Sequence, residues 1–342
     1  VKEFKMTQSM CHFFVFPLKV RYFTIFSEVN MKLKDWLDAW TNGGLKYNIK
    51  KRSLNTYLDV VEKHIKPKLG EYELDQLNIV VLQSFIQQKL EKGNLKTGGA
   101  LSSSTVVLIA NILKQAIYEA NLLEITSKNY AKHIRLPYQH ESSVTAFEKL
   151  EQEKIVKYCA ESKKSNYIGI IICLYTGLRI GELLALEWKD VDFEKNLLSV
   201  TKSAYQGKIN GKIKIIVDTP KTKNSHRVIP LPKQIVQKLK KIKKKSSSKY
   251  IITTKNNQMV GTRSYQRTFE RILCRLNICH KNFHSLRHTF ATRALEFGMD
   301  VKTVSEILGH KNPMITLQRY THSLLSYKRD MMNKFGRQLE IL

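Results

Sequence analysis

The sequence predicts a mainly α-helical protein with a small antiparallel β-sheet, divided into two domains over its 342 residues. From Met31 onward, apolar residues recur at every third or fourth position, which is the period of an α-helix. Between residues 197 and 231 the pattern changes to alternating and β-branched residues, which indicates strands. Residues 132–145 are polar, contain a proline and show no period, so they are interpreted as a linker between the two domains.

The first thirty residues precede the helical pattern and have no clear period of their own. Their most apolar stretch, Met10–Phe26, is interrupted by a proline and two basic residues and lacks a small-residue cleavage site, which argues against a secretion signal. Because Met31 is a plausible start, we expect residues 1–30 to be a disordered leader or a spurious upstream extension. No segment approaches the roughly 20 apolar residues that span a membrane.

Residues 31–131 are expected to form a small all-helical domain. Ser53 can cap its first long helix and Asn78 can open the next one, because such side chains accept hydrogen bonds from the free N–H groups at a helix start. Ser103 or Ser104 can cap a third, longer helix. A domain of roughly one hundred residues can bury a modest core. Its apolar stripes are interpreted as that core, and nothing in it looks catalytic.

Residues 146–342 are expected to form an α+β domain. A nearly continuous apolar helix over Asn166–Tyr175 stops at Gly177, and a second helix follows at once. The strands of the small antiparallel sheet are expected at three places: Leu197–Tyr205, Lys212–Asp218 and Arg227–Leu231. The dipeptide Asn210-Gly211 between the first two is typical of a tight hairpin turn. Helical patterns return from Lys233 and continue toward the C-terminus.

The formal net charge of +29 indicates a polyanionic partner. So large an excess of one sign repels itself in a compact protein unless a polyanion neutralises it. Nucleic acid is the commonest such partner, although a membrane surface or an acidic protein would also fit, and a lysine-rich proteome accounts for part of the excess. The run KLKKIKKKSSSK is interpreted as a solvated surface, with DNA contact as the alternative.

Metal and nucleotide sites are not expected. The cysteines form an odd set without a CxxC pair, which is typical of reduced cytosolic thiols used as small apolar residues. They are Cys11, Cys159, Cys173, Cys274 and Cys279. The sequence contains no phosphate-binding GxxxxGK(S/T) loop and no obvious acidic cluster suited to two metal ions. We therefore expect no cofactor.

Four short segments of the second domain carry residues whose types make chemical sense together. They are TGLRIGELLALEW, TPKTKNSHRVIP, HSLRHTFAT and LGHKN. A tyrosine follows the histidine of LGHKN by ten residues. The residues concerned are Arg179, Lys221, His284, Arg287, His310 and Tyr320. Each of them alone has an ordinary explanation, such as a salt bridge, a solvated lysine or a packed tyrosine. Their joint occurrence in this order in a strongly basic chain is much harder to explain as structure alone.

Together these segments resemble the tyrosine recombinase, or phage integrase, family, whose signature is Arg, Lys, His-x-x-Arg, His or Trp, and Tyr in that order. The resemblance covers the chain from about Met31. It implies a two-domain tyrosine recombinase architecture, with a helical core-binding (SAM-like) DNA-binding domain over residues 31–131 and an α+β catalytic domain over residues 146–342. It also implies a site-specific DNA recombinase that cleaves and rejoins DNA through a 3′-phosphotyrosyl intermediate, during integration or excision of a phage or mobile element.

Three alternatives stay open beside this function. A Xer-like enzyme would use the same chemistry to resolve chromosome or plasmid dimers. The residues before Met31 lack the strand pattern of the arm-binding domain of many integrases, which fits an arm-less enzyme or a truncated gene product. A DNA-binding regulator derived from a recombinase would no longer cut, but all six catalytic positions are intact. A type IB topoisomerase shares the phosphotyrosine chemistry, whereas the helical domain and the HTFAT and LGH segments favour recombination.

The resemblance assigns a role to the tyrosine and the two arginines. Tyr320 would be the nucleophile that attacks the phosphate in line. Arg179 and Arg287 would hold the non-bridging oxygens, since a guanidinium offers forked donors and keeps its charge. Such a field stabilises the pentacoordinate transition state more than the ground state, which accelerates the reaction.

The remaining signature residues would move protons and position the phosphate. A phenol has an unperturbed pKa of about 10, so Tyr320 needs help to attack at neutral pH. His284 would be its general base. Lys221 would be the general acid for the departing 5′-oxygen, with the neighbouring Lys223 as a competitor for that role. His310 would hydrogen-bond the scissile phosphate as a positioning residue.

Neighbouring residues are expected to support these groups. Glu182, one helical turn after Arg179, is expected to hold that arginine in place. His284 and Arg287 lie three residues apart and are expected to share a helix face. His288 is expected on a different side of that helix from His284, so it is interpreted as a structural residue.

The expected partner is double-stranded DNA that carries attachment sites. The tail over residues 322–342 reads as an amphipathic helix that docks on a neighbouring protomer in a DNA-bound homotetramer, with a monomer in solution. A directionality factor or a host DNA-bending protein would be further partners, and no membrane is expected. The phosphotyrosyl linkage conserves the bond energy, so neither ATP nor a divalent metal is needed. The lysine-rich, glycine-poor composition is typical of an AT-rich bacterial genome, which predicts a cytoplasmic, nucleoid-associated protein.

Overall fold

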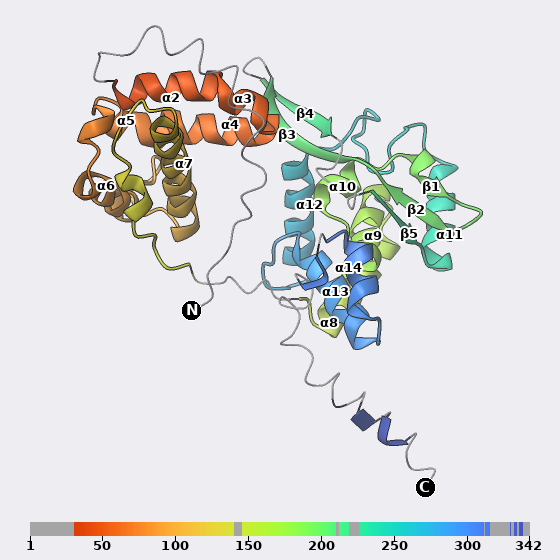
Figure 1. Ribbon diagram of the computed structural model, residues 1–342. Coiled ribbons are helices and arrows are strands. Elements are labelled where there is room, and N and C mark those ends of the chain that lie inside the picture. The colour runs from red at the N-terminus through yellow and green to blue at the C-terminus, as the bar shows by residue number, and fades with distance from the viewer. Residues whose placement is uncertain are drawn as a thin grey trace. The chain divides into compact units, whose positions relative to one another are not determined.

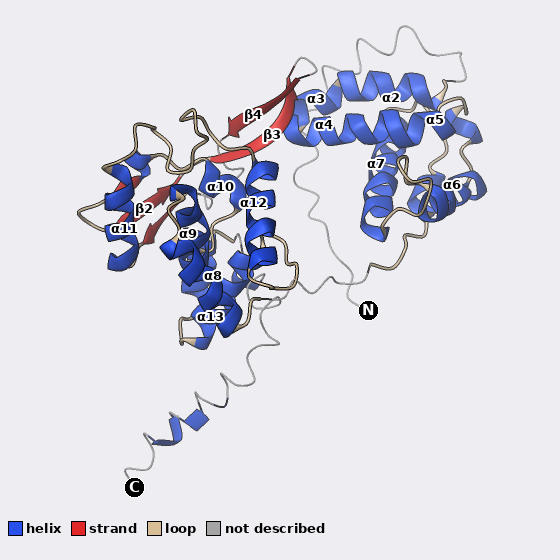
Figure 2. Cartoon of the chain, turned by 180° about the vertical axis from the view of Figure 1, so that it is seen from behind, coloured by secondary structure: helices blue, strands red, loops and turns tan. Residues whose placement is uncertain are grey.

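The computed structural model describes two compact units of the chain, Val1–Glu141 and Ser142–Leu342, each of which is treated by itself. The described residues are 31–139, 146–209, 212–218, 226–310 and 312–314, with 329, 332–333 and 335–337 in the tail. The expected leader over residues 1–30, most of the expected tail helix, and residues 140–145 of the expected linker lie outside this part. Among the described residues helices dominate both units and all five strands lie in the second, as the fold-class prediction required (Figures 1 and 2).

The described residues of the first unit form helices and one isolated β-bridge between Lys32 and Glu73. The helices are α2 (Leu33–Asn42), α3 (Gly44–Asn48), α4 (Lys51–Val60), the π-helical η2 (Val61–Ile65), α5 (Lys66–Leu69), α6 (Ile79–Lys92) and α7 (Ser103–Leu122), with 3₁₀ turns η3 (Leu74–Gln76) and η4 (Tyr130–His133). The segments α4, η2 and α5 follow one another without a break, because Val61, Ile65 and Lys66 all keep right-handed helical dihedrals. The apolar stripes are buried as core, as the sequence pattern predicted.

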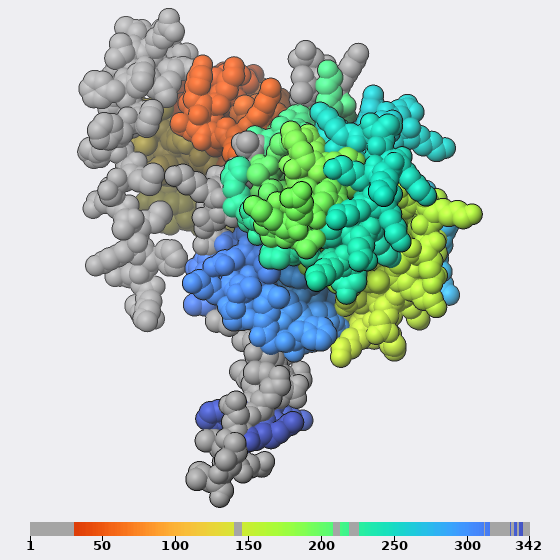
Figure 3. Space-filling model, turned by 90° about the vertical axis from the view of Figure 1, so that its right-hand side faces the viewer, coloured from red at the N-terminus to blue at the C-terminus, as the bar shows by residue number. Residues whose placement is uncertain are grey.

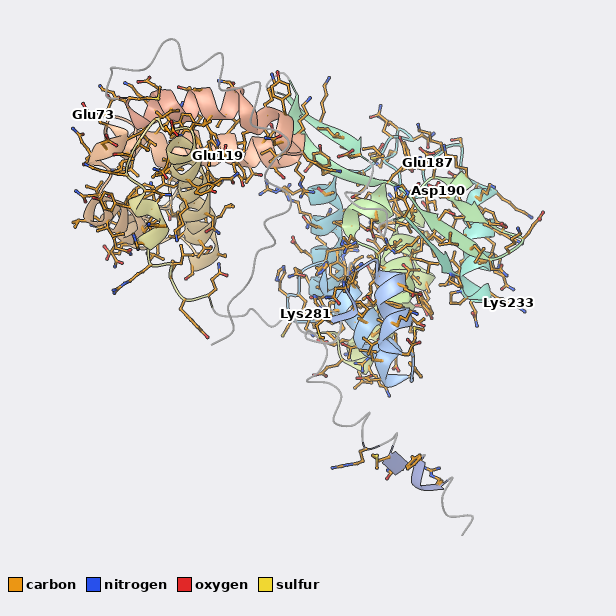
Figure 4. The ribbon with its side chains drawn as sticks, viewed as in Figure 1. Glu73, Glu119, Glu187, Asp190, Lys233 and Lys281 are labelled. Carbon is orange, nitrogen blue, oxygen red and sulfur yellow. The ribbon has the colours of Figure 1, made fainter. Side chains whose placement is uncertain are left out.

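Two tryptophans fix α2 against α7. The indole N–H of Trp36 donates to the carbonyl of Ala116 at 2.8 Å, and that of Trp40 donates to a carboxylate oxygen of Glu119 at 2.7 Å. Glu119 is labelled on α7 in Figure 4. A buried indole is stable only where its N–H finds an acceptor, so these two bonds set the rotation of α2 about its own axis.

The helix starts of this unit follow the sequence prediction in part. Asn78 caps α6 as predicted, since its side-chain oxygen accepts from the N–H of Val81 at 3.0 Å. The prediction for Ser53 is wrong, because α4 begins at Lys51 and Ser53 lies within its first turn. Ser102, one residue before the predicted pair, caps α7. Three consecutive serines are equivalent caps by type, and only the packing of the helix selects among them.

Replacing Asn78 by alanine should destabilise the helical unit by about 1 kcal/mol, because the N–H of Val81 loses its acceptor at the start of α6. The free energy of unfolding in urea measures this loss. Asn78→Asp is the matched control, since its carboxylate can accept the same hydrogen bond and also favours a helix N-terminus. If both variants lost the same free energy of unfolding, the side-chain hydrogen bond of the cap would contribute nothing to stability.

The helical unit extends beyond the predicted boundary at residue 131. Ala131 and Ile134 are buried in its core. The ammonium of Lys114 donates to the carbonyl of Ile134 at 3.1 Å, and the side chain of Gln83 exchanges two hydrogen bonds with the backbone of Arg135 at 3.0 and 3.3 Å. The segment up to Arg135 therefore packs on the helices, which a polar sequence without a period could not indicate.

The second unit places helices around two small sheets. Its helices are α8 (Lys149–Glu161), α9 (Ile168–Thr176), α10 (Ile180–Leu184), α11 (Lys233–Lys243), α12 (Thr262–Arg275), α13 (Ser285–Glu296) and α14 (Val301–Leu308), with 3₁₀ turns η5 (Ser165–Tyr167) and η6 (Trp188–Asp190). Nearly every side chain of α9 is buried, which makes it the central helix, packed between α8 and α13. An all-round apolar sequence requires such a position. At the surface near α8, Lys281 (labelled in Figure 4) pairs with Glu151 at 2.6 Å.

The strands form two antiparallel sheets in the described part of this unit, not one sheet of three strands as predicted. The sheets are β1 (Val191–Asp192), β2 (Leu197–Val200) and β5 (Arg227–Pro230) in the order β1-β2-β5, and the hairpin of β3 (Ser203–Ile209) with β4 (Lys212–Asp218). The predicted strand Leu197–Tyr205 divides at residues 201–202, because its first half pairs with β5 and its second half with β4. The hairpin itself is confirmed, with Ile209 opposite Lys212.

Candidate active site

A left-handed glycine turn positions the first arginine of the predicted site. Helix α9 ends at Gly177, whose φ of 63° is unfavourable for any side chain. A Cβ there would also lie 2.5 Å from Leu308 and 2.7 Å from Phe290. The sharp turn allows the chain to restart at once as α10, with Arg179 as its N-cap residue. The corner that the sequence predicted at Gly177 is therefore confirmed.

Glu182 holds Arg179 through both its backbone and its side chain. The N–H of Arg179 donates to one carboxylate oxygen at 3.0 Å, and its guanidinium donates to the other at 2.9 Å. The carboxylate is almost fully buried, whereas the side chain of Arg179 remains 41% exposed. The predicted role of Glu182 is confirmed, and part of the guanidinium of Arg179 remains open to solvent.

Arg227 is a member of this cluster that the sequence analysis missed. Its guanidinium donates to both oxygens of Glu182, at 2.8 and 3.3 Å, and its Nε donates to the carbonyl of Ile307 at 2.6 Å. Its side chain is only 6% exposed. The sequence placed Arg227 merely at the start of a strand. Its chain neighbours His226 and Val228 are exposed, so no buried stretch of sequence marked this arginine.

The shared carboxylate stays ionised at every physiological pH. Burial acts to raise the pKa of Glu182, but the hydrogen bonds and charges of Arg227 and Arg179 outweigh it and lower the pKa to about 2. One carboxylate thus balances two guanidinium groups, and the site keeps a net positive charge. Such a site favours an anionic ligand.

Replacing Glu182 by glutamine should destabilise the second unit by about 3 kcal/mol at pH 7, since two buried or half-buried guanidinium groups lose their counter-charge. The folded-state pKa is depressed, so the wild-type advantage is present above the unfolded pKa and is lost as the pH falls toward 2. Urea unfolding between pH 7 and pH 2.5 should show the two proteins converging. Glu153→Gln on the exposed surface of α8 is the control, and a constant difference across this range would contradict the assignment.

Arg287 links two distant backbone segments of the site. It is 2% exposed, and its two terminal nitrogens donate to the carbonyls of Gly177 and Leu308, each at 2.8 Å. Gly177 begins the turn that leads to Arg179, and Leu308 ends α14 just before His310. A guanidinium has five N–H donors, so it can hold further acceptors besides these two carbonyls. The bonds therefore bring Arg179, Arg287 and His310 into one neighbourhood.

The two histidines of the predicted site lie at helix ends. His284 is the exposed N-cap residue of α13, and its carbonyl accepts from the N–H of Arg287 at 3.0 Å. His310 follows the left-handed Gly309 at the end of α14, and its N–H donates to the carbonyl of Ser305 at 3.0 Å. A Cβ at Gly309 would lie 3.0 Å from the guanidinium of Arg227, so glycine fits this approach.

The prediction that His288 lies on a different side of α13 from His284 is wrong. The two imidazole rings are 4.9 Å apart, edge to face at 80°. Residues four apart lie on the same side of a helix, so the spacing alone should have placed them together. His288 is buried, and it packs beneath the exposed ring of His284.

The structure does not describe every predicted site residue. Lys221, its competitor Lys223, and Tyr320 lie outside the described residues, so their places in the site remain predictions. Among the described residues, no group of three or more His, Cys, Asp or Glu side chains could hold a metal ion. None of the helices described here is long and apolar enough to cross a bilayer. The described cluster of arginines and histidines can hold the oxygens of a phosphate and accept a proton beside it.

The family comparisons match both units of the chain. Residues 146–326 match the family described as the phage integrase family, and residues 32–90 match the phage integrase N-terminal SAM-like domain. A XerC-like tyrosine recombinase of Caldanaerobacter subterraneus is 30% identical over 87% of this chain and 81% of its own length. The integrase of Staphylococcus phage L54a is 25% identical over 87% of this chain and 90% of its own length.

Solved structures with the same fold are integrases bound to DNA. The integrase of transposon Tn1549 in complex with transposon right-end DNA has a TM-score of 0.75 at 23% identity, over 90% of this chain and all of that chain. A lambda integrase tetramer bound to a Holliday junction has a TM-score of 0.65 at 21% identity, over 87% of this chain and 82% of that chain. These similarities show that the described units have the fold of these proteins.

Proposed function

Because the chain belongs to the phage integrase family of tyrosine recombinases, we propose that it cleaves and rejoins DNA at specific sites to integrate and excise a mobile element. Relatives named as phage and transposable-element integrases support this function. The observation that carries the proposal is Arg287, whose guanidinium joins the turn before Arg179 to the end of α14 before His310. This contact between segments far apart in the sequence supports a shared site for Arg179, Arg287 and His310.

The arginines would bind the scissile phosphate. Arg179 presents an exposed guanidinium that Glu182 holds from behind, and the guanidinium of Arg287 is anchored by its two carbonyl partners. Both groups stay charged, and both are fixed before the substrate arrives. Because negative charge grows on the non-bridging oxygens in the transition state, such preorganised donors lower the barrier. His310 would add a hydrogen bond to the same phosphate.

Tyr320 would attack the phosphorus and form a 3′-phosphotyrosyl bond, while the bond to the 5′-oxygen breaks. His284 would take the phenol proton, and its exposed place at the start of α13 leaves its ring accessible. Lys221, or Lys223 beside it, would give a proton to the departing 5′-oxygen. The energy of the broken phosphodiester is kept in the new one, so rejoining by the reverse reaction would need neither ATP nor a divalent metal.

The partner would be double-stranded DNA with attachment sites, and the active assembly a homotetramer on that DNA. A lambda integrase tetramer on a Holliday junction supports the assembly. We further propose that the tail over residues 322–342 docks on a neighbouring protomer, and that a directionality factor or host DNA-bending protein assists. In a bacterial cell the protein would then act in the cytoplasm at the nucleoid. The net charge of +29 is consistent with a polyanionic partner.

A covalent trapping assay tests the proposed function. The full chain is incubated in EDTA, without ATP, with a nicked suicide substrate that carries an attachment site from DNA flanking the gene. We expect a protein–DNA adduct that survives denaturation. Absence of an adduct on any flanking site would favour a non-cutting DNA-binding protein. Relaxation of supercoiled DNA without any site requirement would favour a topoisomerase.

Resolution of chromosome or plasmid dimers is a second candidate function. A XerC-like recombinase matches 87% of this chain, the same share as the integrase of phage L54a. The chemistry would be the same, and only the DNA sites differ. Attachment repeats that flank the gene, and neighbouring genes of a mobile element, would support integration and excision. A single recombination site near the replication terminus would support dimer resolution instead.

A further inference from the structure

The second unit contains a pocket of about 750 Å³ whose lining includes none of the residues of the candidate active site. We call it the lysine pocket. It lies between the end of α8, the start of α9 and the C-terminal half of α11. Figure 3 shows the face where the yellow-green surface of α8 adjoins the blue-green surface of α11. Lys233 in Figure 4 marks the other end of α11.

Five lysines contribute to the wall of this pocket: Lys163, Lys164, Lys238, Lys241 and Lys245. None of them forms an ion pair with a carboxylate in the described part of the chain. Like charges so close together repel one another and destabilise the fold unless an anion neutralises them. Hydroxyl and amide groups lie between them, at Ser165, Ser246 and Asn257, and can donate further hydrogen bonds.

The floor of the lysine pocket is apolar. Ile168, Ile171 and Ile251 line it, and all three are buried. The thiol of Cys159 also faces this region, and its burial raises its pKa to about 12, so it stays protonated. A phosphate backbone needs only the lysine rim, because it has no apolar group to place on the isoleucines. A ligand that uses the whole pocket must combine negative charge with an apolar group.

The pocket is remote from the candidate active site. Ile168, which lines the pocket, begins α9, and Thr176 ends α9 beside the Gly177 turn. At 1.5 Å per residue, these ends lie about 12 Å apart along the helix axis. A ligand in the lysine pocket therefore does not cover the exposed guanidinium of Arg179, and it could stay bound while DNA occupies the active site.

We propose that the lysine pocket binds an acidic peptide segment of a partner protein, with an apolar side chain on the isoleucine floor and flanking carboxylates on the lysine rim. The pairing of an apolar centre with a charged rim is typical of protein–peptide recognition. The tail of a second copy fits less well, because residues 322–342 contain more basic than acidic side chains and would meet repulsion at the rim. This inference is independent of the recombination chemistry.

The test measures binding of a fluorescein-labelled peptide, with a Leu-Phe pair between two runs of glutamate, to the full chain by fluorescence anisotropy at physiological ionic strength. Replacing Lys238 and Lys241 together by glutamine should weaken binding about tenfold. The matched control replaces Lys154 and Lys157, which are exposed on α8 outside the pocket, and should change binding less than about twofold. Both double variants remove the same total charge.

A substitution that fills the pocket without changing the net charge distinguishes binding in the pocket from general electrostatic attraction to the protein. Ser165→Trp should fill the pocket and weaken the peptide about tenfold without changing the net charge, and Ala160→Phe is a second block if the first variant unfolds. The proposal would be overturned if both lysine double variants lost the same amount of peptide affinity. It would also be overturned if a folded blocking variant lost none. An equal loss of binding to a short non-specific duplex on blocking would overturn it too, because the pocket would then be a DNA contact. The covalent DNA adduct should form normally in every variant.

Discussion

Tyr320→Phe should abolish the covalent protein–DNA adduct and reduce strand exchange by roughly 10⁴-fold or more. The phenol oxygen is the proposed nucleophile, and phenylalanine removes that atom while keeping almost the whole ring. Binding to the attachment site should change less than about twofold, because the arginines that are proposed to hold the phosphate remain. The adduct is measured on denaturing gels and the binding by mobility shift.

Tyr327, which follows Tyr320 closely in the sequence, provides a matched control, because Tyr327→Phe removes a hydroxyl from a tyrosine outside the signature. Its adduct should equal that of the unmodified protein. An adduct that persists in the Tyr320 variant but disappears in the Tyr327 variant would show that the nucleophile had been assigned to the wrong tyrosine. Loss of binding together with the adduct would instead mean that Tyr320 has a structural role.

Arg287→Lys should reduce cleavage by about 10² to 10³-fold, although the charge is kept. A lysine ammonium cannot reach the carbonyls of Gly177 and Leu308 and a phosphate at the same time, because it lacks the planar fork of a guanidinium. The same change leaves a buried carbonyl without its donor, so the catalytic unit should lose about 1–3 kcal/mol of stability. Single-turnover cleavage and urea unfolding measure the two effects.

Arg271→Lys is the control for this change, since Arg271 is exposed on α12 and its hydrogen bonds to Arg267 and Thr268 lie within its own helix. It should affect neither measurement. A substrate with a neutral methylphosphonate at the scissile position then separates catalysis from folding. If Arg287 acts on the phosphate charge, its replacement should matter much less on that substrate. An unchanged ratio between the two substrates would restrict Arg287 to a structural role.

Local signals predicted the parts of the fold that depend on neighbouring residues. Gly177 after an apolar helix predicted where that helix stops, and Asn78 before an apolar stripe predicted a cap; the structure has both. The prediction that Ser53 caps a helix was wrong, because α4 begins at Lys51, and the packing of the helix decides where it begins. The alternation across Leu197–Tyr205 was correctly recognised as extended, but alternation does not identify the partner strand. Pairing is set by contacts far away in the sequence.

In the candidate site, too, the sequence could predict some residues but not those whose role depends on distant contacts. The family motifs identified Arg179 and Arg287, and the three-residue spacing identified Glu182 as the partner of Arg179. Arg227 could not be found in this way, because its role depends on Glu182 and on a carbonyl at the end of α14, both distant along the chain. The lysine pocket could not be predicted either, since its rim combines the run KLKKIKKKSSSK, interpreted as a solvated surface, with Lys163 and Lys164 from a distant segment.

If Arg287 holds the scissile phosphate as proposed, its two backbone contacts make DNA breakage conditional on a complete fold. Gly177 belongs to the first third of its unit and Leu308 to a late helix, so a nascent or partly unfolded chain lacks one of the two acceptors. In such a chain the guanidinium is no longer held in the geometry that a phosphate requires. Strand cleavage should therefore be lost before the rest of the unit unfolds. A damaged molecule then becomes inactive and does not leave a break that it is unable to reseal.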